Sequence, residues 1–266
     1  MSKKHKEAVQ KQFTKTAEAF STFAIRDTPE VLGEKVGFAK PQAMDLVLDI
    51  ACGPGAFVLA VAPRVKFAHG IDLTPEMLRR ACAFQSEKAV TNVAFTCGDA
   101  EQLPLAAGVF DQVSCQCSFH HMPKPLLVLG EMIRVAKPEG RLLIIDPLAP
   151  ESDSKYELYN RIERLRDPSH TSTLRLTTFL SMFDEVGLEV VRQSFRRRPR
   201  SFNQWMLRAG QKPGTKRYQE TRKLMEESMA GDRAGFSAQG QGDDIQIVHN
   251  EAMFLLARKR AADGKQ

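Results

Sequence analysis

Short apolar runs alternate with helical segments between residues 45 and 146, and this alternation limits the choice of fold more than any other feature. Each run is short enough for a buried parallel strand. Strands that alternate with helices are typical of right-handed β-α-β crossovers, so the sequence predicts an α/β fold with a doubly wound sheet. The runs lie at residues 45–51, 67–73, 93–96, 110–115 and 140–146, and the predicted helices at 56–62, 77–88 and 125–136.

The segment before this core predicts an amphipathic helix between His5 and Thr22. Its apolar residues recur at steps of four, four and three, which places them on one helical face: Val9, Phe13, Ala17 and Phe20. A stretch with proline and glycine follows, and we interpret it as a connection to the first strand. Residues 1–40 are therefore expected to form an N-terminal cap region.

The alternation of strands and helices becomes less regular after the core, which we place at residues 41–150. About 50 residues separate the last two predicted strands, too many for a hairpin turn, so we expect a helical insertion at about residues 199–244. Residues 151–266 are interpreted as the C-terminal part of the same domain, with helices on the substrate side. The elements predicted there are helices at 152–166, 177–186 and 218–229 and strands at 188–195 and 245–257.

The composition fits a globular chain of ordinary size. With 266 residues, of which 42% are hydrophobic, the protein can bury a substantial core. No stretch approaches the roughly 18 consecutive apolar residues that a spanning helix needs. The five cysteines lack the dense spacing of a disulfide framework. We expect a cytoplasmic protein without a membrane span, either a monomer or a homodimer.

The net charge of +6 lies mostly in the second half of the chain. Residues 1–150 carry 17 Lys and Arg against 16 Asp and Glu, whereas residues 151–266 carry 21 against 16. Much of the excess is one run, RRRPR, from Arg196 to Arg200. We interpret it as a solvated strand end or loop, and the alternative is a phosphate-binding patch that would suit RNA.

Glycines and carboxylates follow the first two predicted strands, at the edge where open α/β sheets bind ligands. Gly53 and Gly55 allow a tight turn whose amides approach a ligand closely. Asp49 precedes this turn, and Asp72 ends the second strand 23 residues later. A carboxylate there can accept both hydroxyls of a ribose, which predicts a nucleoside cofactor. The loop lacks the third glycine of a dinucleotide site, and no mononucleotide phosphate loop is found.

Five ordered motifs in the core resemble those of class I S-adenosylmethionine-dependent methyltransferases: VLDIACGPG at 47–55, GID at 70–72, CGDA at 97–100, FDQV at 110–113, and residues 129–146. The similarity is greatest to the small-molecule branch, methyltransferase type 11, that includes the quinone-ring methyltransferases of ubiquinone and menaquinone biosynthesis. It implies a Rossmann-like sheet of seven strands, mostly parallel with an antiparallel last strand. It also implies an N-terminal helix and a helical insertion between the last two strands.

The resemblance further implies a cofactor, S-adenosylmethionine, with S-adenosylhomocysteine as its product and no metal. The matched residues are Asp49, Ala51, Cys52, Gly53 and Gly55 for the amino acid end, Asp72 and Leu73 for the ribose, Asp99 and Ala100 for the adenine, and Cys117 and Ser118 beside the sulfonium. Ala51 departs from the family pattern, which usually has glycine there. This change puts the loop geometry in question rather than the cofactor.

Two adjacent histidines follow the fourth predicted strand, where cofactor and acceptor should meet. A histidine titrates near neutral pH, so His120 and His121 are the candidate bases. Alternatively, they cap the next helix or bond to the backbone. His170 lies in a loop that could line the acceptor side, and His249 is interpreted as a surface or packing residue.

Three aromatic residues are candidates for closing the acceptor site. In the family that the chain resembles, the N-terminal segment closes over cofactor and acceptor, which favours a lid that contains Phe13 and Phe20. The same two residues could instead cover the sheet edge. Trp205 is either part of an apolar lid or ordinary packing of the insertion.

These observations predict methyl transfer to an oxygen or carbon of a small aromatic or apolar metabolite. Nucleic acid is not the expected partner. Two alternatives remain open: an RNA methyltransferase or RNA-binding protein that uses Arg196 to Arg200, and a protein that binds the cofactor without catalysis.

Overall fold

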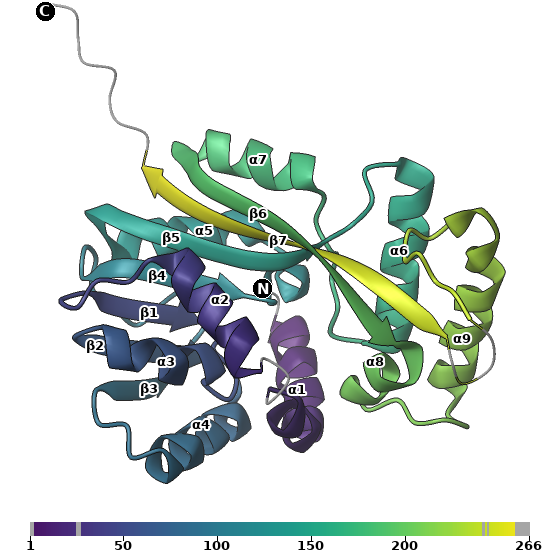
Figure 1. Cartoon of the computed structure of the whole chain (residues 1–266), viewed down its shortest axis with the longest axis horizontal. Coiled ribbons are helices and arrows are strands. Elements are labelled where there is room, and N and C mark those ends of the chain that lie inside the picture. Colours follow the sequence, from purple (N-terminus) through teal and green to yellow (C-terminus); the bar gives the residue numbers. More distant parts are fainter. Residues whose placement is uncertain (1–2, 25–27, 241–242, 244, 259–266) are drawn as a thin grey trace, which may run out of the picture.

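One mixed sheet of seven strands organises the chain, of which the computed structural model describes residues 3–24, 28–240, 243 and 245–258 (Figure 1). The strand order is β3-β2-β1-β4-β5-β7-β6. Neighbouring strands from β1 to β5 are parallel, whereas β7 runs antiparallel to both β5 and β6. The predicted fold class is therefore confirmed. The strands are β1 Leu46–Ile50, β2 Phe67–Asp72, β3 Val93–Cys97, β4 Phe110–Gln116, β5 Ala136–Leu148, β6 Leu188–Ser201 and β7 Gln246–Arg258.

Helices cover both faces of the sheet because successive strand residues point to opposite sides. Leu48 and Ile144 belong to a core that α5 and α7 cover, while Val47 and Ile145 belong to a second core under α2, α3 and α4. The helices are α1 Lys3–Ala24, α2 Pro29–Ala39, α3 Ala56–Val61, α4 Pro75–Glu87, α5 Pro125–Val135, α6 Asp153–Arg166, α7 Leu176–Glu185, α8 Phe202–Arg208 and α9 Lys216–Met229. In the described residues, no helix is both long and apolar enough to cross a bilayer.

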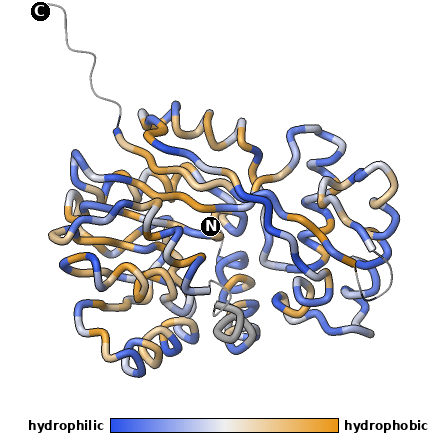
Figure 2. Tube along the Cα trace, in the orientation of Figure 1, coloured by the Kyte–Doolittle hydropathy of each residue, from blue (hydrophilic) through white to orange (hydrophobic). Residues whose placement is uncertain are grey.

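A third cluster lies beyond the sheet, where β6 and β7 continue past their neighbours toward α6, α8 and α9 (Figure 1). Trp205 from α8, Tyr159 from α6 and Phe236 from the insertion are almost completely buried in it. Figure 2 shows that β6 is strongly hydrophilic where it leaves the sheet. The helix α1 lies between the sheet and this cluster and contacts both α4 and α8.

Two elements differ from the sequence prediction. Strand β6 extends to Ser201 instead of ending near residue 195, so the basic run is a paired strand whose residues alternate between two faces. Pro199 is tolerated because β6 is the edge strand. The expected connection after α1 contains helix α2, where Thr28 accepts a hydrogen bond from the Val31 amide at 3.4 Å and Pro29 occupies the first turn.

Candidate active site

The glycine loop after β1 has the backbone geometry that its sequence predicts. Gly53 and Gly55 have φ angles of +54° and +78°, and Ala51, at +54°, adopts the left-handed conformation that glycine accommodates more easily. A side chain at Gly55 would approach the Phe95 ring to 2.8 Å, whereas the space beside Gly53 is open. The Gly53 amide donates to Asp72 at 2.8 Å, which ties the loop to the end of β2.

Two buried carboxylates stand at the ends of β1 and β2. Ser114 donates to Asp49 at 2.6 Å, yet burial raises the pKa of Asp49 to about 7. Burial also raises the pKa of Asp72, although the amides of Gly53 and Thr74 each donate to one of its oxygens at 2.8 Å. Lys35 from α2 is only 3% exposed and acts electrostatically on Asp49. This pair of opposite charges was not predicted, because α2 was not.

A cavity of about 310 Å³ extends from these carboxylates to the residues of β6, α6 and α8. Gly55 and His170 are not part of its lining, and the side chain of Phe20 in α1 lies outside the described residues. The candidate site residues that line it are Phe13, Asp49, Ala51, Cys52, Gly53, Asp72, Leu73, Asp99, Ala100, Cys117, Ser118, His120, His121 and Trp205.

His120 forms a pair with Asp146, which ends β5 and is 1% exposed. Nδ1 of His120 donates to Oδ1 of Asp146 at 2.8 Å, while the amides of Ser118 and Phe119 donate to Oδ2 at 2.8 and 3.0 Å. Burial by itself would lower the pKa of His120, but the Asp146 carboxylate raises it above its ordinary value. Nε2 has no hydrogen-bond partner among the described residues, so it is available at the cavity.

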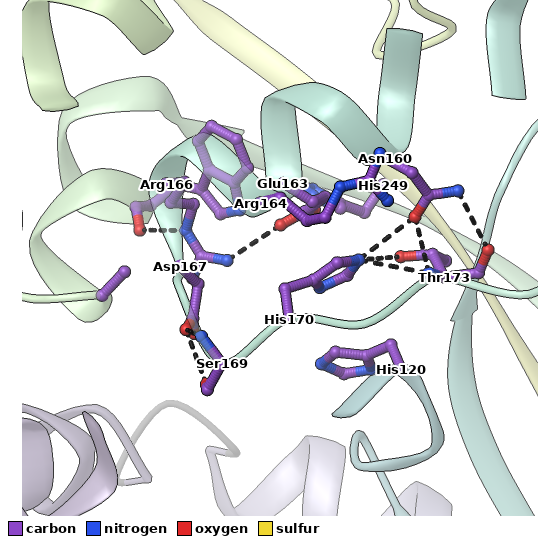
Figure 3. A network of polar contacts seen from close by, with 12 residues as sticks. His120, Asn160, Glu163, Arg164, Arg166, Asp167, Ser169, His170, Thr173 and His249 are labelled. Carbon is purple, nitrogen blue, oxygen red and sulfur yellow. Dashed lines mark hydrogen bonds and ion pairs between the residues drawn. The ribbon is translucent and has the colours of Figure 1, made fainter. Parts of the chain in front are cut away.

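The other two histidines of this cluster differ from His120. His121 donates from Nδ1 to the Ser169 carbonyl at 3.0 Å, and burial together with the nearby His120 lowers its pKa to about 4. His170 contacts the Asn160 side chain through Nε2 at 3.1 Å, and burial lowers its pKa (Figure 3). Its ring centroid lies 5.4 Å from that of His120, and His170 is not among the residues that line the cavity. His170 therefore packs against His120 without facing the cavity.

The half of the cavity next to β6, α6 and α8 is lined by charged residues that the sequence did not predict at this site. Arg166, Arg198, Arg200 and Arg208 line it, together with three acidic residues. In the basic run, the inward face of β6 carries Arg198 and Arg200, whereas Arg197 is exposed on the outer face. The alternation of arginines at every second position was a signal for such a strand. The run is therefore a strand end, one of the two expected structures, but it is only partly solvated, because Arg196, Arg198 and Arg200 are half-buried.

His249 is buried at 4% exposure and lines the same half of the cavity, so it is not a surface residue. Its Nε2 donates to Glu163 at 3.2 Å, and burial lowers its pKa to about 4. Arg166 donates to Glu163 at 3.0 Å (Figure 3). Its guanidinium also stacks over the Trp205 ring, 4.6 Å from the ring centroid. Trp205 thus packs in the third cluster and also forms a wall of the cavity.

Helix α1 covers the cavity and bridges its two sides. Lys6 forms an ion pair with Asp99, and Gln10 donates to the Leu73 carbonyl at 2.9 Å. On the other side, Gln12 donates to the Ala209 carbonyl at 2.9 Å. Phe13 lines the cavity and packs edge-on against His121, with ring centroids 5.1 Å apart. The described residues hold no group of three or more His, Cys, Asp or Glu placed to bind a metal ion.

Comparison with known proteins matches residues 43–187 to the family described as "Methyltransferase domain". The chain belongs to this family. The methyltransferase is 35% identical over 198 residues to the Bacillus subtilis protein YcgJ, named an uncharacterized methyltransferase; the match covers 74% of this chain and 78% of YcgJ. It is also 36% identical over 120 residues to a demethylmenaquinone methyltransferase of Lactococcus lactis, a match that covers 42% of this chain and 47% of the relative.

Solved structures agree with this assignment. The crystal structure of YcgJ superposes with a TM-score of 0.77 at 30% identity, and covers 87% of this methyltransferase and 98% of YcgJ. A structure from Bacillus halodurans C-125, described as a methyltransferase, gives a TM-score of 0.79 at 30% identity over 86% of this chain and 99% of its own. The similarity therefore includes elements well beyond the 145 residues from 43 to 187.

Proposed function

We propose that this methyltransferase uses S-adenosylmethionine to methylate an oxygen or carbon of a small molecule, with His120 as the general base. The observation that carries the proposal is that a single cavity joins the strand-end carboxylates to the His120–Asp146 pair. The cofactor half and the base therefore face one shared space. The small-molecule character is supported by enclosure of that space under α1 and by the demethylmenaquinone methyltransferases among the relatives.

The residues at the glycine loop fit this cofactor. The backbone amides that hold Asp72 fix its carboxylate and leave each oxygen a lone pair for a ribose hydroxyl. The open space beside Gly53 allows close approach of a ligand to the backbone. Asp49 and Lys35 offer opposite charges for an ammonium and a carboxylate. When bound, S-adenosylmethionine supplies an electrophilic methyl group on a sulfonium.

His120 would take the proton that an acceptor hydroxyl or acidic carbon loses as it is methylated. In the neutral imidazole, Asp146 holds the proton of His120 on Nδ1, so Nε2 is the nitrogen that can accept a proton from the acceptor. His121 stays neutral and bonded to the loop that carries Ser169, which supports a structural role. The closed cavity would exclude water and hold the acceptor in line with the methyl group.

The RNA alternative depended on the basic run from Arg196 to Arg200, which is mostly not exposed. Arg196 and Arg198 are ion-paired to Glu251, and Arg200 lines the cavity, which leaves Arg197 as the exposed arginine of the run. A single exposed arginine does not form the basic surface that RNA binding requires. The non-catalytic alternative is disfavoured by the free Nε2 of His120 at the cavity.

The test is turnover of a panel of small phenols and hydroxy acids, followed through formation of S-adenosylhomocysteine. His120→Ala should lower turnover by about 10²- to 10⁴-fold while the affinity for S-adenosylhomocysteine is kept. Since a base works deprotonated, wild-type turnover should rise with pH through a pKa above the ordinary histidine value. Asp146→Asn should move this rise to lower pH and reduce the maximal rate. Equal loss of turnover and cofactor affinity in His120→Ala would contradict a base.

A further inference from the structure

One cation of the cavity forms no ion pair with the described residues. Arg200 lies near the end of β6, is half-buried and lines the cavity. Within the described parts of the chain, its guanidinium has neither a hydrogen bond nor an ion pair. It lies close enough to Cys117 and Glu251 for their charges to act on it. Because Cys117 immediately precedes Ser118 at the end of β4, Arg200 borders the region where cofactor and acceptor would meet.

The acidic residues of this half already have cationic or hydrogen-bonding partners. Glu251 is shared by two arginines, with Arg198 at 3.1 Å and Arg196 on its other oxygen. Glu163 accepts from Arg166 and from His249, as described above. The positive charge therefore exceeds the negative charge around Glu251.

The third acidic residue of this half, Asp167, accepts hydrogen bonds from its own loop. The Ser169 amide and hydroxyl donate to it at 2.9 and 2.6 Å. Asp167 is thus bound within the turn after α6, and it forms no ion pair with Arg200.

A guanidinium stays charged in proteins, and a half-buried one is costly unless an anion approaches it. We propose that Arg200 binds an anionic group of the methyl acceptor, a carboxylate or a phosphate, and so selects small anionic acceptors. This inference rests on the proposed function and deepens it. The cofactor has its own cation for a carboxylate, Lys35 beside Asp49, so Arg200 is left for the acceptor.

Trp205 provides a direct readout, because it is the only tryptophan of the chain and lines the same half of the cavity. Its fluorescence should be followed in protein saturated with S-adenosylhomocysteine. The probes are benzoate and phenyl phosphate, compared with neutral benzamide and benzyl alcohol. We expect both anions, or the one whose group matches the acceptor, to bind more tightly than the neutral probes.

Arg200→Gln should weaken anion binding by about tenfold or more, because a hydrogen bond between charged groups is lost. Arg197→Gln, on the outer face of the same strand, is the matched control and should bind the anions as the wild type does. Arg200→Lys keeps the positive charge, so it should retain part of the preference for anions. Its binding would show that a substitution at this position does not by itself abolish the site. The stronger of benzoate and phenyl phosphate identifies the group.

Three results with these probes would overturn the proposal: no binding of either anion, equal binding of anionic and neutral probes, or anion affinity unchanged in Arg200→Gln. Affinity for S-adenosylhomocysteine, measured separately by calorimetry, should be the same in wild type and Arg200→Gln. If it falls in the variant, Arg200 serves the cofactor and the proposal is wrong. If the wild type does not bind S-adenosylhomocysteine at all, the proposed function itself fails.

Discussion

Burial of Asp49 in the folded chain disfavours its charged form, whereas binding of an ammonium group favours that form. Asp49 is 3% exposed, and burial raises its pKa from 3.8 to about 7 despite the hydrogen bond from Ser114. The folded chain therefore holds this proton more tightly than the unfolded chain. The contribution of Asp49 to stability is present at low pH and is lost as the pH rises from 3.8 through 7. A cationic ligand would add to the favourable charge that Lys35 already places near the ionised carboxylate.

Asp49→Asn should therefore raise the melting temperature of the ligand-free protein at pH 8, and the gain should shrink as the pH falls below 7. The same variant should bind S-adenosylmethionine more weakly at pH 8, since the amide cannot pair with the ammonium group. Thermal unfolding and calorimetry measure the two effects. Asp111→Asn is the control, for which the opposite change in stability is expected. Partial burial opposes ionisation of Asp111, but hydrogen bonds from the Leu46 amide and Lys137 lower its pKa. Loss of this carboxylate should therefore destabilise the protein. Lower stability of Asp49→Asn at pH 8 would contradict this account.

Sequence analysis identified carboxylates by their place at strand ends, and the same rule applies to Asp146, which was not singled out. The pairing of Asp146 with His120 joins β5 to the end of β4, and 26 residues separate them in the chain. Lys35 gave no comparable signal, and Arg200 was noted only as part of the basic run. The roles of Lys35 and Arg200 depend on which charged groups lie near them in the folded chain, and tertiary contacts determine this.

At the scale of elements, α1 covers the cavity, and we expect its contacts to break during ligand exchange. Lys6 pairs with Asp99, the residue matched to the adenine, and Gln10 bonds to the end of β2. A double variant, Lys6→Ala with Gln10→Ala, should release S-adenosylhomocysteine roughly fivefold faster or more, because an ion pair and a hydrogen bond no longer hold the cover. Stopped-flow dissociation measures this rate. Lys4→Ala, exposed on the same helix, should leave the rate unchanged, and an unchanged rate in the double variant would show that α1 does not limit exchange.

Element prediction succeeded where a local pattern decided the structure. The apolar stripe through Val9 and Phe13 correctly indicated α1, and the short apolar runs indicated β1 to β5. Helix α2 was missed because Gly33 and Gly37 favour loops, while its stability comes from packing of Val36 and Phe38 under the sheet. Strand β6 was cut short because its second half is held by pairing with β7, which a local pattern does not reveal.

At the scale of the whole molecule, the candidate active site is a cavity lined by two parts of different character. The core of the sheet supplies the glycine loop, the carboxylates and His120, whereas α6, α8 and the far end of β6 supply the arginines and Trp205. The long strands β6 and β7 join the two parts, and α1 lies between them (Figure 1). The sequence predicted the first part in detail because its motifs are local. It predicted the second only as a helical insertion.

Calorimetric titration with S-adenosylhomocysteine, with NAD as the control ligand, tests the central claim most directly. We expect the wild type to bind S-adenosylhomocysteine and not NAD. Asp72→Ala should bind it at least about tenfold more weakly, because charged hydrogen bonds to the ribose are lost. Binding of NAD without S-adenosylhomocysteine, or unchanged affinity in Asp72→Ala, would contradict the site described here.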